Sequence, residues 1–258
     1  MQPAFPTVSL NMCRVLLLTI LAVLLTVSHA CAGPTVVIGA EDDWAPYSSA
    51  PQQHPQGFAV DVVREAFALA GVRAEFRALP YSRCMAETRA GQLTACFDAV
   101  PNSLIRPFYL WPRMPLFSTR MNIYARSGSR QRGLRTKDLE GHTVGVQRDY
   151  EYGEEFDVNT QIRRRVVDKN EYGFRMLMAD RIEYMAAEER IARALFRSKP
   201  DEFAGRFTLV GTVATPDLFI AFSKSAPDSR EMLGKFNEGY DKLLNSPRYK
   251  QIEDRWFK

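Results

Sequence analysis

The sequence is poor in the residues on which most enzymes and metal proteins depend. Only three of its 258 residues are His and four are Cys. His29, His54 and His142 stand without a nearby nucleophile motif, and the chain contains no GxSxG, HExxH, Walker glycine loop or CxxC. The potential metal ligands do not cluster. We therefore predict no catalytic residues, no metal and no cofactor, and a binding role is favoured over an enzymatic one.

Long apolar runs are also scarce, because the only one is VLLLTILAVLLTV at 15–27. A bilayer requires about 20 residues, so this run is too short to span it. It follows Arg14 and precedes the Ala-Cys-Ala triplet at 30–32, which is the pattern of a secretory signal cleaved before Gly33. A lipid anchor on Cys31 and a buried core helix are the alternatives. We expect residues 1–32 to be a signal peptide and the remainder to be exported to the periplasm.

Charge of one sign is not in large excess. Residues 1–32 hold Arg14 as their only charged side chain, so their removal lowers the formal net charge from +4 to +3. Lys and Arg are scattered, with no stripe of basic and aromatic residues, and nucleic acid is therefore not indicated as a partner. After the signal we expect a soluble monomer without stable membrane insertion, formed by one large domain or two lobes of about 100 residues each.

Two cysteines, Cys84 and Cys96, lie beyond the signal, and an exported protein meets an oxidising compartment. Cys84 falls near the start of a predicted helix, and Cys96 lies in the strand that follows. The two side chains can meet if the helix packs back onto the sheet. A disulfide between them and a pair of buried free thiols are both compatible with the sequence.

Apolar periodicity predicts alternating strands and helices in two successive series. The first series has strands at 36–39, 72–79 and 93–97 and helices at 58–70 and 82–90, with Ser82 expected as a helix cap. The second has strands at 120–125, 143–147, 165–167, 182–186 and 207–210, with helices at 152–156, 172–178 and 189–196. An apolar stretch at 218–222 and helices at 230–244 and 247–257 close the chain. This order predicts α/β lobes with mostly parallel sheets.

Polar and aromatic residues follow the predicted strands of the first series. Glu41, Trp44 and Tyr47 come after the first strand, in the segment EDDWAPYS, and Tyr81 comes after the second. Asp98 follows the third, and Arg106 offers a fork of donors suited to a carboxylate. A plain turn with a packed Trp and an Asp98–Arg106 surface pair are the alternatives. Ligands of open α/β sheets bind beyond the carboxyl ends of strands, so these residues are candidates for a ligand site.

The second series repeats this placement. Arg148, Asp149, Tyr150 and Tyr152 lie between a predicted strand and a helix, where a helix N-terminus attracts anions. Glu188 follows another strand, and a helix cap is its alternative role. Because candidates from both series fall at the carboxyl ends of strands, we expect them to face one crevice.

Four segments occur in order along the chain: IGAEDDWAPYS with GFAVDVVREAFALAG, RAGQLTACFDAVPNSLIRPFYLWPRMPLF, DLEGHTVGVQRDYEYGEEF, and LFIAFSK with FNEGYDKLLNSPRYKQIEDRWF. Together they resemble the bacterial extracellular solute-binding proteins of the polar amino-acid type, family 3. The resemblance covers essentially all of residues 35–258. It implies an α/β periplasmic-binding-protein fold of type II, in which two lobes close on a small solute that is delivered to an ABC importer. The first lobe would comprise 33–118 and 221–258, and the second 119–220.

The resemblance also implies roles for individual residues. Glu41 stands where the family often has an acid near the ligand ammonium, Trp44 and Tyr81 stand at the aromatic walls, and Arg106 stands at the carboxylate-binding arginine. In the second lobe, Glu188 stands at the acid that holds the ammonium.

Tyr150 lies in the loop that usually offers a hydroxyl and amides to the carboxylate. Asp98 and Pro101 depart from the family pattern, which has small residues or hydroxyls at these positions, and Pro101 has no N–H to donate. A buried Asp98 would favour a more cationic solute, or would pair with Arg106 and weaken carboxylate binding.

Two other functions are compatible with the same fold. One is a dehydratase-like enzyme acting on a small carboxylic acid, with Asp98, Glu41 or Glu188 as general acid. The other is a sensory module that presents its closed form to a receptor.

Overall fold

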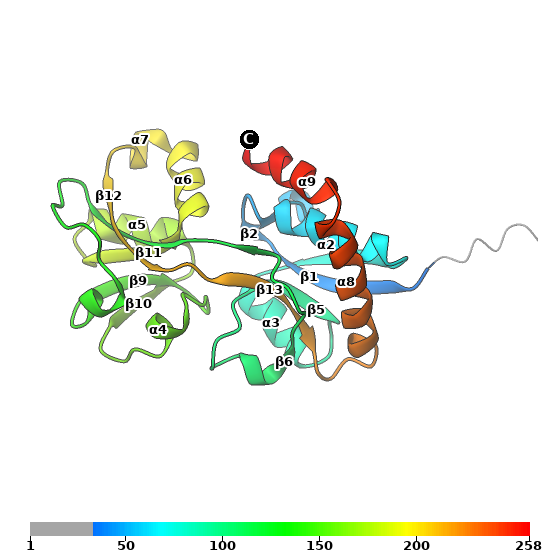
Figure 1. Ribbon diagram of the computed structural model, residues 1–258. Coiled ribbons are helices and arrows are strands. Elements are labelled where there is room, and N and C mark those ends of the chain that lie inside the picture. Colours follow the sequence, from blue (N-terminus) through cyan, green and yellow to red (C-terminus); the bar gives the residue numbers. More distant parts are fainter. Residues whose placement is uncertain (1–32) are drawn as a thin grey trace, which may run out of the picture. The chain divides into compact units, whose positions relative to one another are not determined.

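The computed structural model describes residues 33–258 of the chain. The predicted signal peptide, its cleavage site and Cys31 lie outside the described residues. From Thr35 onward the chain forms one compact unit that contains two large mixed sheets, each covered by helices (Figure 1). The α/β fold class predicted from the strand–helix alternation is confirmed, but the sheets are mixed and not mostly parallel as expected, because later strands pair antiparallel with the parallel ones. Among residues 33–258, no helix is both long enough and apolar enough to cross a membrane.

The first sheet combines strands from both ends of the described chain. Its first three strands run parallel, and the others join antiparallel. In order they are β4 (Arg73–Leu79), β1 (Thr35–Glu41), β5 (Ala95–Ala99), β13 (Asp217–Ser223) and β6 (Tyr109–Leu110), with β7 (Phe117–Ser118) also paired to β13. The helices that accompany this sheet are α2 (Phe58–Leu69), α3 (Tyr81–Arg89), α8 (Ser229–Leu244) and α9 (Arg248–Phe257). We call this sheet with its helices the first lobe.

The second sheet is built from the middle of the chain and repeats the pattern. Its strands, in order, are β10 (Arg163–Val167), β9 (Thr143–Gln147), β11 (Tyr184–Glu188), β8 (Met121–Arg126) and β12 (Phe207–Ala214). The first three are parallel, whereas β8 and β12 are antiparallel to their neighbours. With the helices α4 (Glu154–Asp157), α5 (Asn170–Met178), α6 (Glu189–Ser198) and α7 (Pro200–Phe203), this sheet forms the second lobe.

Several short elements complete the fold. The hairpin of β2 (Asp43–Trp44) and β3 (Ser48–Ser49) follows β1 directly and carries most of the EDDWAPYS segment. Single 3-10 turns occur at η1 (Pro51–Gln53), η2 (Arg106–Phe108) and η3 (Thr136–Leu139). Their brevity explains why apolar periodicity did not reveal them, because a period cannot be recognised over two to four residues.

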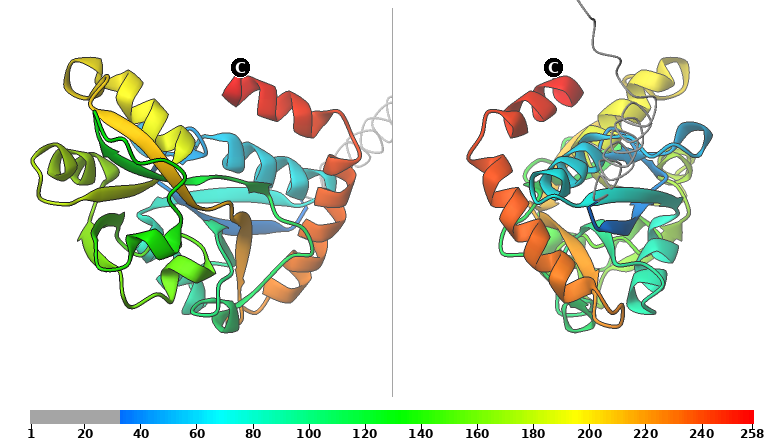
Figure 2. Two further views of the ribbon diagram at one scale, coloured as in Figure 1. Left: turned by 60° about the vertical axis from the view of Figure 1, so that its left-hand side comes forward. Right: turned by 90° about the vertical axis from the view of Figure 1, so that its right-hand side faces the viewer.

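Helix α2 shows how the apolar pattern produces the packing of the first lobe. Its buried residues recur at helical spacing, as amphipathicity requires: Phe58, Ala59, Val60, Val62, Val63, Ala66 and Phe67. The helix packs along α8, and the views agree on this neighbourhood (Figure 2). Gly239 of α8 makes the contact close, because a Cβ there would lie 1.8 Å from the backbone oxygen of Ala66. Helix α3, by contrast, begins at Tyr81, and the expected Ser82 cap is absent because Pro80 occupies the cap position.

Two short connections join the sheets. The chain leaves the first sheet after Ser118, enters the second at Met121, and returns between Ala214 and Asp217. The two connections lie side by side, because the N–H of Thr119 donates to the backbone oxygen of Pro216 at 3.1 Å. The sequence-based boundary at 220 therefore falls inside β13. The division into a discontinuous first lobe, 33–118 with 221–258, and a second lobe, 119–220, stays a prediction.

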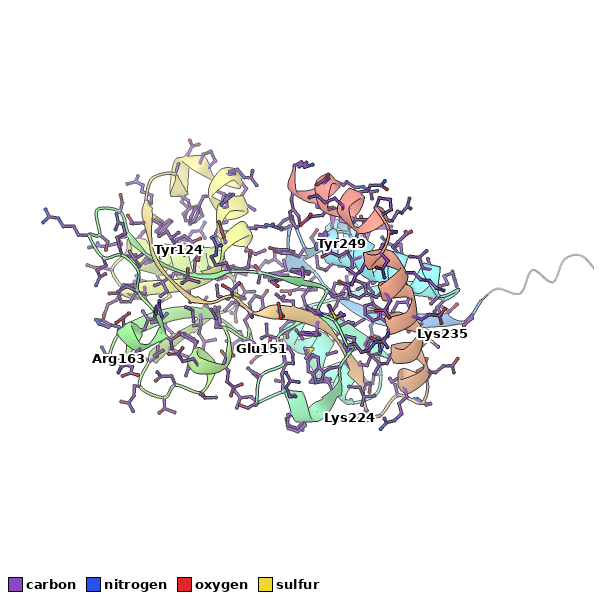
Figure 3. The ribbon with its side chains drawn as sticks, in the orientation of Figure 1. Tyr124, Glu151, Arg163, Lys224, Lys235 and Tyr249 are labelled. Carbon is purple, nitrogen blue, oxygen red and sulfur yellow. A yellow bond between two sulfur atoms is a disulfide. The ribbon has the colours of Figure 1, made fainter. Side chains whose placement is uncertain are left out.

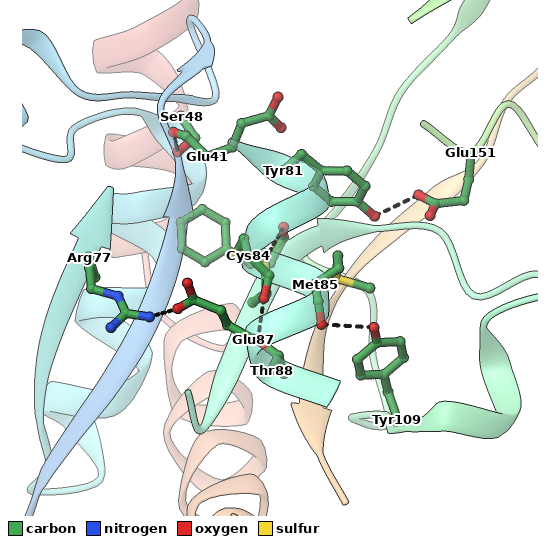
Figure 4. The surroundings of a disulfide bond; sticks show 12 residues. Glu41, Ser48, Arg77, Tyr81, Cys84, Met85, Glu87, Thr88, Tyr109 and Glu151 are labelled. Atoms are coloured by element: carbon green, nitrogen blue, oxygen red, sulfur yellow. Dashed lines mark hydrogen bonds and ion pairs between the residues drawn. A yellow bond between two sulfur atoms is a disulfide. The ribbon is translucent and has the colours of Figure 1, made fainter. Parts of the chain in front are cut away.

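A disulfide between Cys84 and Cys96 ties α3 to β5, with a Cα–Cα distance of 5.9 Å (Figure 4). The helix does pack back onto the sheet, so the bonded alternative is confirmed and the pair of free thiols is not. Gly39 of β1 makes room for the bond, since a Cβ at Gly39 would lie 2.4 Å from Sγ of Cys84.

Removal of this bond should destabilise the protein without changing its fold. We expect the Cys84→Ser, Cys96→Ser double variant to lose about 2–4 kcal/mol of unfolding free energy, because the unfolded chain regains the freedom that the bond removes. Urea unfolding of the oxidised wild-type protein and the variant measures the difference. Coincident unfolding curves, or two thiols titrated in the unreduced denatured protein, would contradict the bond.

Candidate functional site

A small cavity of about 10 Å³ lies between the two lobes. Three carboxyl side chains and three aromatic rings line it, and three apolar side chains complete the wall. The first lobe provides Glu41, Trp44, Tyr81 and Asp98, and the second provides Tyr150 and Glu151. A cavity of this size holds about one water molecule.

The fold brings these residues together through strand ends. Glu41 is the last residue of β1, Tyr81 follows β4 closely, and Asp98 lies near the end of β5. Tyr150 and Glu151 lie in the segment between β9 and α4 of the second lobe. The carboxyl ends of neighbouring parallel strands meet at one edge of a sheet, which is where ligands of open α/β folds bind. The cavity therefore occupies the expected position.

Two tyrosine–glutamate hydrogen bonds cross this cavity in opposite directions. The hydroxyl of Tyr150 in the second lobe donates to Oε1 of Glu41 in the first. The hydroxyl of Tyr81 in the first lobe donates to Oε2 of Glu151 in the second at 2.6 Å (Figure 4). Glu151 lies in the region between the two sheets (Figure 3). Each lobe thus supplies one donor and one acceptor to the contact.

Burial dominates the electrostatics of the three acids. Desolvation raises the pKa of Glu41 well above its usual value, although the hydrogen bond from Tyr150 opposes this and the nearby Asp98 reinforces it. Desolvation alone raises the pKa of Asp98. The pKa of Glu151 rises to about 8, again through desolvation and against the hydrogen bond from Tyr81. Burial thus shifts all three acids toward their protonated, uncharged forms relative to solvated carboxyl groups.

Asp98 is the least satisfied of the three. Its side chain is buried, with 6% of the residue exposed, and neither carboxyl oxygen has a hydrogen-bond partner within the described part of the chain. Its backbone adopts φ +70°, a left-handed conformation that Asp tolerates better than most residues. The Nε1–H of Trp44, in the same cavity wall, is also without a partner there. An unpaired buried carboxyl group is costly to stability, so it calls for a functional explanation.

A larger cavity of about 530 Å³ adjoins the small one, because Glu41, Tyr81 and Tyr150 line both. Its outer wall carries two ion pairs. Lys169 of the second lobe contacts Asp43 of the first at 2.7 Å, and Arg148 contacts Asp168 at 2.8 Å.

Further polar contacts join the lobes beside these cavities. The side-chain amide of Asn102 donates to Asp157 at 2.8 Å, and the N–H of Ser103 donates to Glu154 at 2.7 Å. Together with the tyrosine–glutamate bonds, they hold the strand ends of the two lobes against each other. The described conformation is therefore one in which the lobes are in contact.

Three residues predicted for the site lie elsewhere in the structure. Arg106 is exposed on η2, where its guanidinium donates to the backbone oxygen of Pro101 at 3.1 Å, so it forms no pair with Asp98. Tyr47 is buried between Trp44 and Phe117, and its hydroxyl donates to Glu188 at 3.0 Å.

Glu188 closes β11 and caps α6, accepting from the N–H of Ile191 at 2.8 Å. Its alternative role, a solvated helix cap, is met in part, because the cap is present but buried. With Tyr47, Glu188 lines a separate cavity near the connections between the lobes. Arg106 and Glu188 therefore do not face one cavity in this conformation, and their joint action on a zwitterion stays a prediction.

Sequence reasoning missed Glu151 and Lys169. Glu151 belongs to the segment DLEGHTVGVQRDYEYGEEF, from which Arg148 and Tyr150 were predicted as ligand contacts and Glu151 was not. The position after a strand was the available signal. Lys169 could not be recognised, since its partner Asp43 is distant in sequence and meets it only when the lobes touch.

No group of three or more His, Cys, Asp or Glu side chains in the described chain is arranged to hold a metal ion.

Because burial raises the pKa of the three acids that line the small cavity, we expect the unfolding free energy of the protein to fall as the pH rises. Between pH 4.5, the usual pKa of Glu, and about 8, folded Glu151 binds more protons than unfolded Glu151, so the unfolding free energy decreases with pH. The wild-type protein should therefore lose unfolding free energy between pH 5 and pH 9. We expect the Glu151→Gln variant to lose about 2–4 kcal/mol less over the same range.

Urea unfolding at several pH values measures this slope. The control is Glu155→Gln, at an exposed position of the same segment, which should keep the wild-type slope. Equal slopes in wild-type protein and Glu151→Gln would show that Glu151 titrates normally.

Comparisons with solved structures agree with the fold. The chain is similar to an ancestral arginine-binding protein bound to arginine, with 19% identity, a TM-score of 0.72, and coverage of 88% of this chain and 100% of that chain. It is similar to a histidine kinase sensor domain, with 21% identity, a TM-score of 0.74, and coverage of 88% and 97%.

A third similar structure is the arginine-, lysine-, histidine-binding protein ArtJ from the thermophilic bacterium Geobacillus stearothermophilus, with 18% identity, a TM-score of 0.71, and coverage of 86% and 95%. At these identities the likeness establishes the fold alone. A comparison with curated proteins finds no match.

The family model gives the assignment that the single structures cannot. The model of the bacterial extracellular solute-binding proteins, family 3, matches residues 36–258, which include every strand and helix described above from β2 onward and nearly all of β1. The resemblance noted in the sequence is thus confirmed: the chain belongs to the bacterial extracellular solute-binding proteins, family 3.

Proposed function

We propose that this protein captures a small polar solute between its two lobes and releases it unchanged. The observation that carries the proposal is the pair of tyrosine–glutamate hydrogen bonds between the lobes, Tyr150 to Glu41 and Tyr81 to Glu151. They surround a cavity whose polar groups come from both lobes. A solute that touches both lobes stabilises the closed form, because only differential contact shifts a conformational equilibrium.

The site offers binding groups of two kinds. Rings of Trp44, Tyr81 and Tyr150 can cover the faces of a solute, whereas Glu41, Asp98 and Glu151 can accept hydrogen bonds from it. The adjoining cavity of about 530 Å³ gives room for the rest of the molecule. Binding of a solute by these groups accounts for the residues that line both cavities.

Delivery to an ABC importer in the periplasm is the role we propose for the captured solute. Membership of family 3 supports it, as do the arginine-binding and the arginine-, lysine-, histidine-binding proteins among the similar structures. A sensory role is the second candidate, and the similar histidine kinase sensor domain favours it. Solute uptake lost on deletion of the gene and restored by the wild-type gene would select transport over sensing.

A thermal-shift screen of amino acids, amines, peptides and small acids tests solute capture. We expect at least one solute to raise the melting temperature, because binding to the folded state stabilises it by mass action. Mass spectrometry should recover that solute unchanged. A library in which nothing shifts the melting temperature, or a solute recovered as a different product, would contradict the proposal.

Truncation of Tyr150 tests the position of the site. Tyr150 packs against apolar clusters of both lobes, so Tyr150→Ala should weaken binding of the identified solute by about tenfold or more. Tyr172→Ala is the control, because Tyr172 is an exposed tyrosine of the same lobe that lines neither cavity. Calorimetry measures both affinities. Equal solute affinities of the two variants would show that the solute does not bind at Tyr150.

A further inference from the structure

We propose that the solute is a small organic cation without a carboxylate group, an amine or guanidine whose charged end enters the cavity of Glu41, Asp98 and Glu151. This inference rests on the proposed function and specifies its cargo. It differs from the capture of a zwitterionic amino acid, which requires a partner for the carboxylate as well as for the ammonium group.

The charges around the cavity favour a cation. Glu41, Asp98 and Glu151 line it, and no Lys, Arg or His of the described chain does. A solute carboxylate placed there would lie among acids in a region of low dielectric constant, where like charges repel strongly. A cation would instead allow the carboxyl groups to ionise against it.

The nearby cations are already engaged. Lys169 pairs with Asp43 and Arg148 pairs with Asp168, both on the outer wall of the larger cavity. Arg106, the expected carboxylate ligand, is exposed and donates to Pro101. A carboxylate in this site would have to share one of these cations with the group that it already contacts, whereas an amine needs none of them.

Asp98 supplies an independent observation. Its carboxyl group is buried in the cavity wall, and both oxygens lack a partner within residues 33–258. Such a group costs stability unless something binds it. An ammonium or guanidinium group donates several charge-assisted hydrogen bonds and would satisfy it.

The aromatic rings add a second attraction for a cation. Tyr81 and Tyr150 meet edge to face, with 5.5 Å between ring centroids and an interplanar angle of 78°. Trp44 and Tyr150 meet in the same manner, at 6.4 Å and 86°. All three rings line the small cavity, and the negative face of an aromatic ring attracts cations.

The tyrosine hydroxyls occupy the places that the cation would take. Tyr150 donates to Glu41 and Tyr81 donates to Glu151, so both acids are satisfied by donors from the opposite lobe. The cavity of about 10 Å³ is too small for an amine until one of these donors withdraws. Release of the Tyr150 hydroxyl from Glu41 would join the small cavity to the larger one, since Tyr150 lines both, while the ring stays available to cover the solute.

Matched pairs of solutes that differ only in the carboxylate test the inference. Arginine is compared with agmatine, and lysine with cadaverine, by calorimetry on the mature protein. We expect agmatine or cadaverine to bind at least tenfold more tightly than its amino-acid counterpart. Equal or tighter binding of the amino acids, or no binding of either amine, overturns the cation inference.

The variant Asp98→Asn tests whether the Asp98 carboxyl group binds the charged end of the solute. Asn tolerates the left-handed backbone of Asp98, so the fold should persist. We expect amine affinity to fall about 10- to 100-fold, because a charge-assisted contact becomes a neutral one. The melting temperature should stay equal or rise, because an unsatisfied buried carboxyl group is removed.

Asp61→Asn is the matched control, at a partly buried acid of the same lobe that lines neither cavity and whose oxygens accept from Arg64, Arg255 and Trp256. It should lower the melting temperature and leave amine affinity within about threefold of wild type, a small change on the scale of one charged hydrogen bond. Equal loss of affinity in both variants would contradict the special role of Asp98.

Different results would reject the cation inference and the proposed function. If the screen finds a neutral or anionic solute but no amine, solute capture stands and the cation inference is rejected. If no solute of any class binds, the proposed function itself is rejected.

Discussion

Three carboxyl groups are buried where the two lobes meet, and burial disfavours their charged forms. Glu41 and Glu151 each receive a tyrosine hydroxyl from the opposite lobe, whereas Asp98 receives no donor within the described chain. Burial raises the pKa of all three, so in the absence of a cation a proton is the means of removing their charge. The tyrosine–glutamate hydrogen bonds join the lobes, and the carboxyl oxygens of Asp98 remain as acceptors for a solute. The contact between the lobes and the candidate site for the solute therefore share the same residues.

The sequence predicted most of the fold because the long elements carry their own periodicity. Helix α2 buries residues at helical spacing, and each strand of five or more residues overlaps a strand or apolar stretch that was expected from the sequence. The two-residue strands β2, β3, β6 and β7 were not predicted. The sequence did not predict where the chain returns to the first lobe. That boundary depends on β13 pairing with β5, and a pairing between strands so distant in sequence leaves no local signal.

The site was predicted in part, for a related reason. Glu41, Trp44, Tyr81, Asp98 and Tyr150 line the small cavity, because position after a strand is a local property that the sequence displays. The contacts between lobes are not local. Glu151 pairs with Tyr81, and Glu188 is satisfied by Tyr47 and Thr119, only through the folding of distant segments. Arg106 lies on the surface because η2 turns it outward beside Pro101.

A pH titration of Asp98 tests whether burial without a hydrogen-bond partner raises the pKa of this carboxyl group. Nuclear magnetic resonance of the side-chain carboxyl carbons can follow each acid through a pH titration of the solute-free protein, with Asp98→Asn used to assign the signal. We expect the Asp98 carboxyl group to keep its proton to a clearly higher pH than a solvated aspartate does, because it is buried without a partner within residues 33–258. Titration of Asp98 near pH 4, as in a solvated aspartate, would contradict the account.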